Sequence, residues 1–331
     1  MKKPRRRKRR SNPYRFIPLT SLFIFLTCFL LIKGGRSGVF TPADSKSEDF
    51  PASLDLVREV PDISPPDEAA MNIPDVKDVS ITKSDSDTNV GVFINNSSSL
   101  DISIDDFLSG DLPVELTEKG VQVLIVHTHG SESYTPTAEN YYEYTENDRT
   151  TDTRYNVVRV GDEIEKILNE RGISTVHVRE IFDSPTYSGS YTRSLEAISN
   201  AMKENPSIKI VIDVHRDAII AKDGTKYKTV AEIDGKTAAQ LMFVTGTSGG
   251  GLSHDNWQKN LSFHAMIHRE MNKRYPGIMR PISIRDSRFN QHVSTGSMLL
   301  EVGSSGNTLE EAIYSASLFA DTLADMLLEE S

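Results

Sequence analysis

From residue 112 onward, short apolar runs rich in β-branched residues alternate with helical patterns, and this alternation limits the fold more than any other feature. The predicted strands are Val121–Val126, Ser174–Val178, Ile208–Val214, Leu241–Thr245 and Met298–Glu301, and the predicted helices are Val157–Leu168, Arg193–Met202, Trp257–Tyr275 and Asn307–Leu328. Strands that alternate with helices predict an α/β fold, in which a mostly parallel sheet has helices on both faces. Ligand sites of such folds lie outside the carboxyl ends of the strands, so we expect reactive side chains just past these strands.

Three of the predicted strands end in side chains of the kinds that bind zinc. His129 and Glu132 follow the first strand as an H-x-x-E pair, and Gly130 between them can take the turn that brings both together. The third strand ends in His215, and the last strand ends in Glu301. Imidazole nitrogen and carboxylate oxygen are usual zinc ligands, and catalytic sites keep one position open. We therefore predict that His129, Glu132 and His215 bind Zn²⁺ and that Glu301 is the acid/base of a metallohydrolase.

His127 leaves the choice of ligand partly open. In an extended strand residues i and i+2 face the same way, so His127 and His129 are expected on one face. We prefer His129 as the ligand because it completes the H-x-x-E pair, and His127 is then expected behind the ligands or facing the substrate. By the same rule Asp213 shares a face with His215. It is expected to orient a ligand imidazole, or otherwise to be a turn residue at the strand end.

Other polar residues near the predicted strand ends are candidates for binding a substrate carboxylate or stabilising an oxyanion. These candidates are Arg216, Arg285, Arg288, Asn290, Gln291 and His292. The acidic, tyrosine-rich loop 139–152 is expected to rim the cleft. His177 lies among apolar neighbours within a predicted strand, which predicts a structural role.

The N-terminal end of the chain predicts a membrane anchor. Residues 1–36 contain 11 basic residues and no acidic residue, and Phe16–Ile32 is an uncharged apolar run. As a helix this run would be about 25 Å long, enough for a thin bilayer core. Because most of the cations precede it, residues 1–15 are expected in the cytoplasm and the rest of the chain outside. No small-x-small cleavage site follows, which favours a retained signal anchor over the alternative, a cleaved signal peptide.

Residues 33–111 have the composition of an acidic, Pro/Ser-rich extracytoplasmic tether. Between residues 37 and 110 there are 15 acidic and 4 basic residues, and prolines recur. Such a segment is expected to be extended, although Val90–Ile94 is apolar enough to form a strand or bind a partner. The catalytic domain is then expected to span residues 112–331. The net charge of −10, with an acidic body, excludes a general nucleic-acid binder.

Several long strings in residues 112–331 resemble the stage II sporulation protein P family, cell-wall hydrolases of endospore-forming bacteria. The strings, in family order, are VLIVHTHGSESY, VIDVHRDA, GTSGGGLSHDNWQKNL and RFNQHVSTGSMLLEVGSSGNTLEEA. The resemblance implies the fold of zinc-dependent N-acetylmuramoyl-L-alanine amidases. It also implies cleavage between muramic acid and the stem peptide, an endopeptidase activity on cross-links, and a role in septal wall thinning and engulfment. The implied partners are peptidoglycan, the transglycosylase stage II sporulation protein D and other engulfment proteins, at the membrane of the forespore septum.

Carried over by position, the family's zinc site falls on His129, Glu132 and His215, with Glu301 as the acid/base. The broader amidase superfamily takes its glutamate ligand from the helix after the first strand, and here that helix has no obvious counterpart. The alternatives to Glu132 are Glu139, Glu143 and Glu146. Two other functions also stay open: a zinc carboxypeptidase-like wall peptidase, and a non-catalytic wall-binding scaffold of an engulfment complex.

Overall fold

The computed structural model describes residues 75–82, 91–108, 110–117, 119–145 and 147–329. The basic segment, the apolar run Phe16–Ile32 and the first part of the acidic segment lie outside these residues. Within the described part of the chain, no helix is both long and apolar enough to cross a membrane. The N-terminal anchor and its topology therefore stay predictions.

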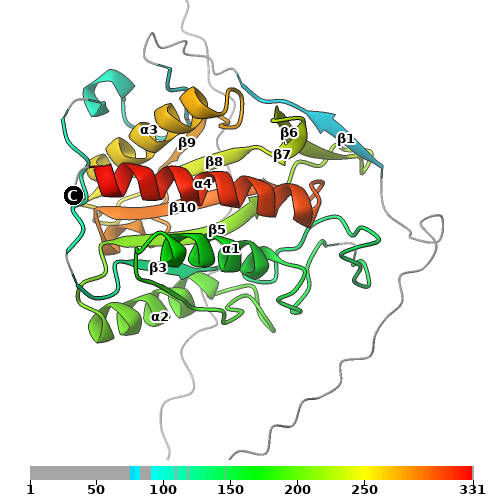
Figure 1. The fold of residues 1–331 in the computed structure, drawn as a ribbon, viewed down its shortest axis with the longest axis horizontal. Helices are drawn as coiled ribbons and strands as arrows, with labels where there is room; N and C mark the ends of the chain where they lie inside the picture. The colour runs from blue at the N-terminus through cyan, green and yellow to red at the C-terminus, as the bar shows by residue number, and fades with distance from the viewer. Residues whose placement is uncertain (1–74, 83–90, 109, 118, 146, 330–331) are drawn as a thin grey trace, which may run out of the picture. The chain divides into compact units, whose positions relative to one another are not determined.

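A seven-stranded mixed sheet forms the centre of the fold (Figure 1). Its strands, in spatial order, are β2 (Ile94–Asn96), β9 (Ile282–Arg285), β8 (Leu241–Gly246), β10 (Gly296–Ser304), β5 (Ile210–Asp217), β3 (Val123–Val126) and β4 (Thr175–His177). Every neighbouring pair is parallel except β8 with β10. The predicted α/β class with a mostly parallel sheet is confirmed.

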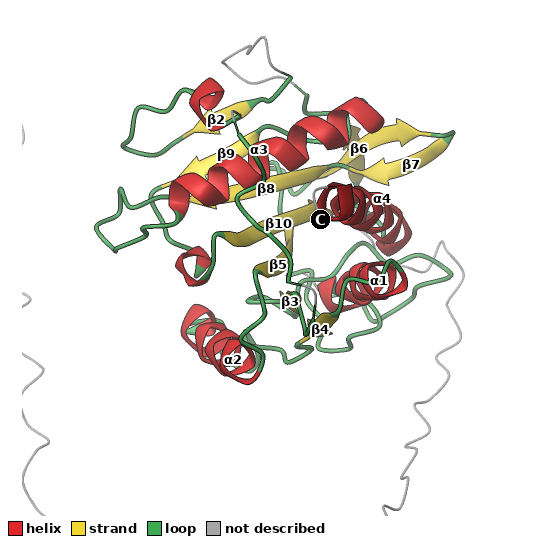
Figure 2. Ribbon diagram, turned by 60° about the vertical axis from the view of Figure 1, so that its left-hand side comes forward, coloured by secondary structure: helices red, strands yellow, loops and turns green. Residues whose placement is uncertain are grey.

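Helices cover the two faces of this sheet unequally. The helices are α1 (Val157–Glu170), α2 (Ser190–Glu204), α3 (Trp257–Arg274) and α4 (Leu309–Glu329). Alternate residues of β5 separate the two faces: Ile210 and Ile212 join the main core with α1, α3 and α4, whereas Val211 packs with Ile198 of α2. Figure 2 shows α2 across the sheet from α1 and α4. On the α2 side, the parts of β8, β9 and β10 beyond this helix line an open cavity.

A second sheet contains β1 (Val76–Val79), β6 (Lys226–Ile233) and β7 (Lys236–Ala239), in that order. Strands β6 and β7 form a hairpin that turns at Asp234 and Gly235, both at positive φ, as tight hairpin turns require. Both β1 and β2 come from the acidic segment that composition predicts as a tether. The folded part of the chain therefore extends upstream of residue 112. The run Val90–Ile94, a possible strand in the sequence, overlaps the start of β2, whereas the average composition gives no sign of β1.

The helix α4 is capped by Thr308, one residue after the predicted helix start at Asn307. The Thr308 hydroxyl accepts a hydrogen bond from the backbone N–H of Glu311 (3.3 Å), and the Glu311 carboxylate accepts one from the N–H of Thr308 (3.1 Å). This reciprocal pair is a capping box. The Asn307 side chain instead accepts hydrogen bonds from the N–H groups of Ser304 and Thr229, which joins β10 to β6.

Candidate active site

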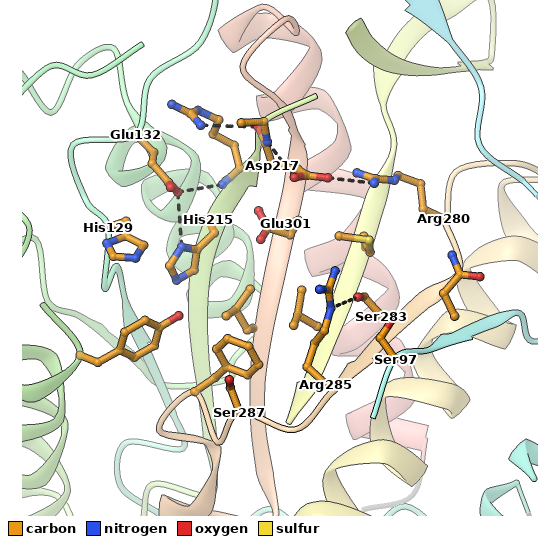
Figure 3. Close-up of a pocket in the computed structure, with 18 of the residues that line it drawn as sticks. Ser97, His129, Glu132, His215, Asp217, Arg280, Ser283, Arg285, Ser287 and Glu301 are labelled. Atoms are coloured by element: carbon orange, nitrogen blue, oxygen red, sulfur yellow. Dashed lines mark hydrogen bonds and ion pairs between the residues drawn. The ribbon is translucent and has the colours of Figure 1, made fainter. Parts of the chain in front are cut away.

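Three of the predicted site residues meet on the open face of the sheet (Figure 3). The register of β10 against β5 sets Glu301 directly beside His215. The nearer Glu132 carboxylate oxygen lies 3.3 Å from Nδ1 of His215, and an Asp213 oxygen lies 3.0 Å from its Nε2. Both strands continue past these residues, to Asp217 and Ser304, so the reactive groups sit on a strand face rather than beyond the strand ends. The strands continue through these polar residues, which are tolerated because the face that carries them lines a cavity.

Glu132 and His215 form a buried ion pair. Burial opposes a charge on His215, but Asp213 and Glu132 outweigh it and raise the pKa of His215 well above its ordinary value. Burial also opposes the charge of Glu132, and the hydrogen bond with His215 outweighs it and lowers the pKa of Glu132 to about 2. The backbone N–H of Arg216 donates a further hydrogen bond to the same carboxylate (3.2 Å). Glu132 is therefore held as an anion that faces an imidazole.

Glu301 has the opposite electrostatic setting. Burial raises its pKa to about 8, and the nearby Glu132 and Asp217 charges add to this effect. Its Oε2 atom is buried and has no hydrogen-bond partner among the described residues. A carboxyl group whose pKa lies near neutrality can both take up and release a proton, which is what general acid–base catalysis requires.

His129 stands beside this pair, at the mouth of the cavity. Its ring stacks on Tyr187, with centroids 4.4 Å apart, and meets the His215 ring edge-on at 5.3 Å. Burial and the nearby His215 lower the pKa of His129, which favours the neutral imidazole that binds metals. Nδ1 of His129 is buried without a hydrogen-bond partner in the described structure, and Nδ1 of His215 faces the Glu132 carboxylate. These two nitrogens and the Glu132 carboxylate suit zinc as a donor set.

The donor atoms of His129, Glu132 and His215 are not all within 4.8 Å of one another. In the parts of the chain that the structure describes, that spacing is met only by a different group on α1 and β4. The structure thus places the three predicted ligands next to one another, but their donor atoms are further apart than in a formed metal site. Of the alternatives to Glu132, Glu139 and Glu143 are exposed, and Glu146 lies outside the described residues.

The prediction that His127 and His129 share a face is wrong. His127 continues the alternation of β3 and points toward α1, where it is buried. Its Nδ1 lies 3.0 Å from the carbonyl oxygen of Val214, and its Nε2 lies 2.7 Å from Nε2 of His177. The strand ends at Val126 and a turn follows, so His129 no longer obeys the strand alternation. His127 therefore faces neither the cavity nor the predicted ligands.

A substitution at Gly161 of α1 would test how tightly the His127–His177 pair is packed against this helix. A Cβ at this position would lie 2.7 Å from Nε2 of His127 and 2.8 Å from Cε1 of His177. Alanine normally stabilises a helix interior relative to glycine by about 0.5–1 kcal/mol. Because the rings would have to move, we expect Gly161→Ala to lower the free energy of unfolding by about 1–3 kcal/mol instead. Urea denaturation followed by circular dichroism measures this, and a stabilised variant would contradict the packing.

Several predicted substrate-binding residues instead hold the backbone around the site. The Arg216 guanidinium donates to the carbonyl oxygens of Ser133 (2.9 Å) and Asp148 (2.6 Å). Gln291 bridges the end of β8, where it accepts from the N–H of Gly246 and donates to the carbonyl of Val244. Asn290 likewise donates to the carbonyl of Tyr191 on α2 (2.8 Å). These side chains are occupied by backbone groups and fix the shape of the cavity wall.

The cavity itself has a volume of about 1140 Å³ and runs across β5, β10, β8 and β9. Arg288, Asn290, Gln291 and His292 do not line it, whereas Arg285 does, as its candidacy predicted. Lining residues that the sequence did not single out are Arg149, Tyr187, Tyr191, Met242, Arg280 and Phe289. Arg149 comes from the loop expected to rim the cleft, and it pairs with Glu132 (3.4 Å) and Asp183.

Solved amidase structures share only a remote similarity with this chain. The N-acetylmuramoyl-L-alanine amidase AmiC2 of Nostoc punctiforme is 13% identical, with 65% of this chain and 98% of that chain covered and a TM-score of 0.35. The amidase Ami1 from Mycobacterium smegmatis is 12% identical, with 65% and 100% covered and a TM-score of 0.39. Superpositions at these TM-scores are too loose to transfer an activity.

Sequence similarity is closer. The chain is 31% identical over 227 residues to stage II sporulation protein P of Bacillus subtilis (strain 168). The match covers 65% of this chain and 53% of the relative, so the chain spans about half the length of the curated relative that it matches. The family model described as Stage II sporulation protein P (SpoIIP) matches residues 55–324. The chain therefore belongs to the stage II sporulation protein P family.

Proposed function

We propose that this chain is a membrane-anchored, zinc-dependent peptidoglycan hydrolase that acts in septal wall degradation during sporulation. Its activities would be those of an N-acetylmuramoyl-L-alanine amidase with the fold of that class, and of a peptidoglycan endopeptidase. The observation that carries the proposal is Glu301, a carboxyl group of raised pKa beside the Glu132–His215 pair on the floor of a long open cavity. Membership of the sporulation family supports the same substrate and process.

In this proposal His129, Glu132 and His215 hold the zinc ion, which when bound polarises water and the amide carbonyl. Glu301 accepts a proton from the attacking water at Oε2, and passes it to the nitrogen of the departing amine. Asp213 keeps the His215 ring in place, since its two oxygens also accept hydrogen bonds from the N–H (2.8 Å) and hydroxyl (2.6 Å) of Thr128. The carboxylate that orients the imidazole is thereby itself fixed to the turn after β3.

The far end of the cavity is suited to the charged part of a stem peptide. Arg280 pairs with Asp217 (2.8 Å), and its Nε and Nη1 atoms are buried without a hydrogen-bond partner among the described residues. Arg285 is exposed and bonds to Ser283 through Nε (2.8 Å), and Figure 3 shows its guanidinium directed into the cavity. Arginine favours carboxylates because its donors form a planar fork. We infer that a stem-peptide carboxylate lies here while the scissile amide lies by Glu301.

Replacement of Arg285 tests this placement. We expect Arg285→Gln to raise the KM for soluble peptidoglycan fragments about tenfold with little change in kcat, because one charge-assisted hydrogen bond to bound substrate is lost. Arg288→Gln is the matched control, since Arg288 donates to the carbonyl of Ser253 (3.1 Å) and does not line the cavity. An equal effect of both variants would show that only the general positive charge matters.

Product analysis tests the reaction itself. The full-length chain, incubated with purified peptidoglycan and zinc, should release stem peptides and leave free muramic acid ends. Trimmed stem peptides with intact lactyl-amide bonds would indicate the carboxypeptidase-like alternative. An absence of products, together with normal engulfment in cells carrying His129→Ala and His215→Ala, would indicate the wall-binding scaffold.

The partners and the location are part of the same proposal. Residues 1–15 are expected in the cytoplasm, residues 16–32 in the membrane, and the catalytic part outside, next to a stage II sporulation protein D-like transglycosylase. The acidic balance of the chain after its basic N-terminus does not favour electrostatic capture by an anionic wall, so substrate access would depend on the anchor and partners. Deletion of residues 1–32 should therefore impair engulfment more than it impairs cleavage of soluble fragments.

A further inference from the structure

A second cluster of metal-binding side chains lies on α1 and β4, and it does not share residues with the cavity. Asp162 and Glu165, about one helical turn apart on α1, both face His177 of β4. Nδ1 of His177 lies 3.3 Å from an Asp162 oxygen and 3.6 Å from a Glu165 oxygen. These are the donors that all lie within 4.8 Å of one another, a spacing that no other His, Cys, Asp or Glu group among the described residues meets.

The His177 side chain is fully buried (0% exposed), and its Nδ1 has no hydrogen-bond partner in the described structure. The neighbouring His127 occupies the other ring nitrogen of His177, Nε2. Nδ1 of His127 faces the carbonyl oxygen of Val214, which can only accept, so this nitrogen must carry the hydrogen. Nε2 of a neutral His127 is then an acceptor, and the 2.7 Å contact requires Nε2 of His177 to be the donor.

Nδ1 of His177 is therefore directed at two carboxylates and makes no hydrogen bond in the described structure. Such an arrangement is unfavourable unless a positive charge lies among the three groups. Arg179 supplies part of that charge from the solvent side, because its Nε bonds to Asp162 (2.8 Å) and its Nη2 bonds to Glu165. It makes no hydrogen bond to Nδ1, however, so the buried nitrogen still lacks a partner.

We propose that Asp162, Glu165 and His177 form a second Zn²⁺ site, which fastens α1 to β4. One imidazole nitrogen with two carboxylates suits zinc, whereas Ca²⁺ and Mg²⁺ prefer sites made of oxygen alone. The other His177 nitrogen donates to His127, and His127 donates to Val214, so the usual outer hydrogen bond of a metal-bound histidine is present. Bound zinc would displace the half-exposed Arg179 from the carboxylates. The site is independent of the proposed hydrolase function.

The number of zinc ions bound to the purified full-length chain tests the proposal. After equilibrium dialysis, elemental analysis should find one zinc equivalent fewer in Glu165→Gln than in the wild-type chain. Glu170→Gln is the matched control, because it makes the same change at an exposed position of the same helix, and it should bind as much zinc as the wild type. In a His215→Ala background one equivalent should remain, and added zinc should raise the melting temperature unless Glu165 is also replaced.

Arg179→Gln gives a test that does not depend on loss of binding. Because the competing guanidinium is removed, we expect zinc to bind this site about fivefold more tightly, as for a partly exposed ion pair. Equal zinc content in the wild type, Glu165→Gln and Glu170→Gln would overturn the proposal, and so would the loss of all zinc in His215→Ala. A chain without hydrolase activity that still loses zinc through Glu165→Gln would contradict only the proposed function.

Discussion

Replacing Glu301 with glutamine is expected to slow stem-peptide release by about 10²–10⁴-fold, because the proposed mechanism gives this side chain both proton transfers. Glutamine has nearly the same shape and keeps a polar group beside His215. Burial raises the pKa of Glu301 to about 8, and this cost of ionisation is absent in the amide. The variant should therefore fold at least as well as the wild type while losing the reaction, which separates catalysis from stability.

Three measurements define this result: the initial rate of release from purified peptidoglycan, the zinc content and the melting temperature. Glu232→Gln is the matched control, because Glu232 is an exposed glutamate of β6 that does not line the cavity. It should leave all three values unchanged. A Glu301→Gln chain that releases stem peptides at the wild-type rate would remove Glu301 from the mechanism. Loss of zinc together with activity would instead make it a ligand.

The meeting of Glu301 with His215 was predictable from the sequence because it depends on local patterns and on one rule of topology. Each residue follows an apolar run, and adjacent parallel strands bring such positions together. The positions at which the two strands end were harder to predict. Polar residues were read as strand ends, whereas β5 and β10 continue through them along the cavity floor. Polar residues can lie within a strand where the face that carries them lines a cavity.

Parts of the cavity wall, Tyr187 and Arg280 among them, could not be predicted, because loops supply them. Tyr187 reaches His129 from the loop before α2, and Arg280 reaches Asp217 from the segment before β9. No pattern in the sequence relates these positions. The converse error concerns Arg216 and Gln291, which look like free functional groups in the sequence. Their donors are taken up by backbone carbonyls, a role that depends on tertiary structure alone.

Strand β1 is not predicted from the sequence, whereas the apolar run Val90–Ile94 marks a possible strand that ends where β2 begins. Strands β1 and β2 lie in an acidic segment whose average composition resembles a linker, and each is held by pairing with a distant strand, β6 or β9. The hairpin of β6 and β7 carries a recognisable signal, Asp234-Gly235, that the alternation of strands and helices did not use. Propensity is weak in such strands, so tertiary pairing decides their structure.

Glu132→Gln is expected to weaken zinc binding in the cavity by more than about 100-fold, because even residues that only support a ligand contribute 10–100-fold. Hydrolysis should be lost with the metal. The anionic carboxylate opposes His215 at 3.3 Å, and its low pKa, about 2, means that it is charged at every pH where the enzyme would work. An amide in its place offers zinc only a neutral oxygen. Asp213, 3.0 Å from Nε2, then remains as the carboxylate that faces His215.

Glu143→Gln is the matched control, since Glu143 is an exposed alternative ligand, eleven positions further along the same connection. Glu132 also has a structural part, through the hydrogen bond from the N–H of Arg216. The two roles differ in their response to zinc. If Glu132 is a ligand, zinc raises the melting temperatures of the wild type and of Glu143→Gln. It raises the melting temperature of Glu132→Gln by less. If the role of Glu132 is purely structural, Glu132→Gln lowers the melting temperature by the same amount with and without zinc. Loss of zinc in Glu143→Gln alone would instead identify Glu143 as the ligand.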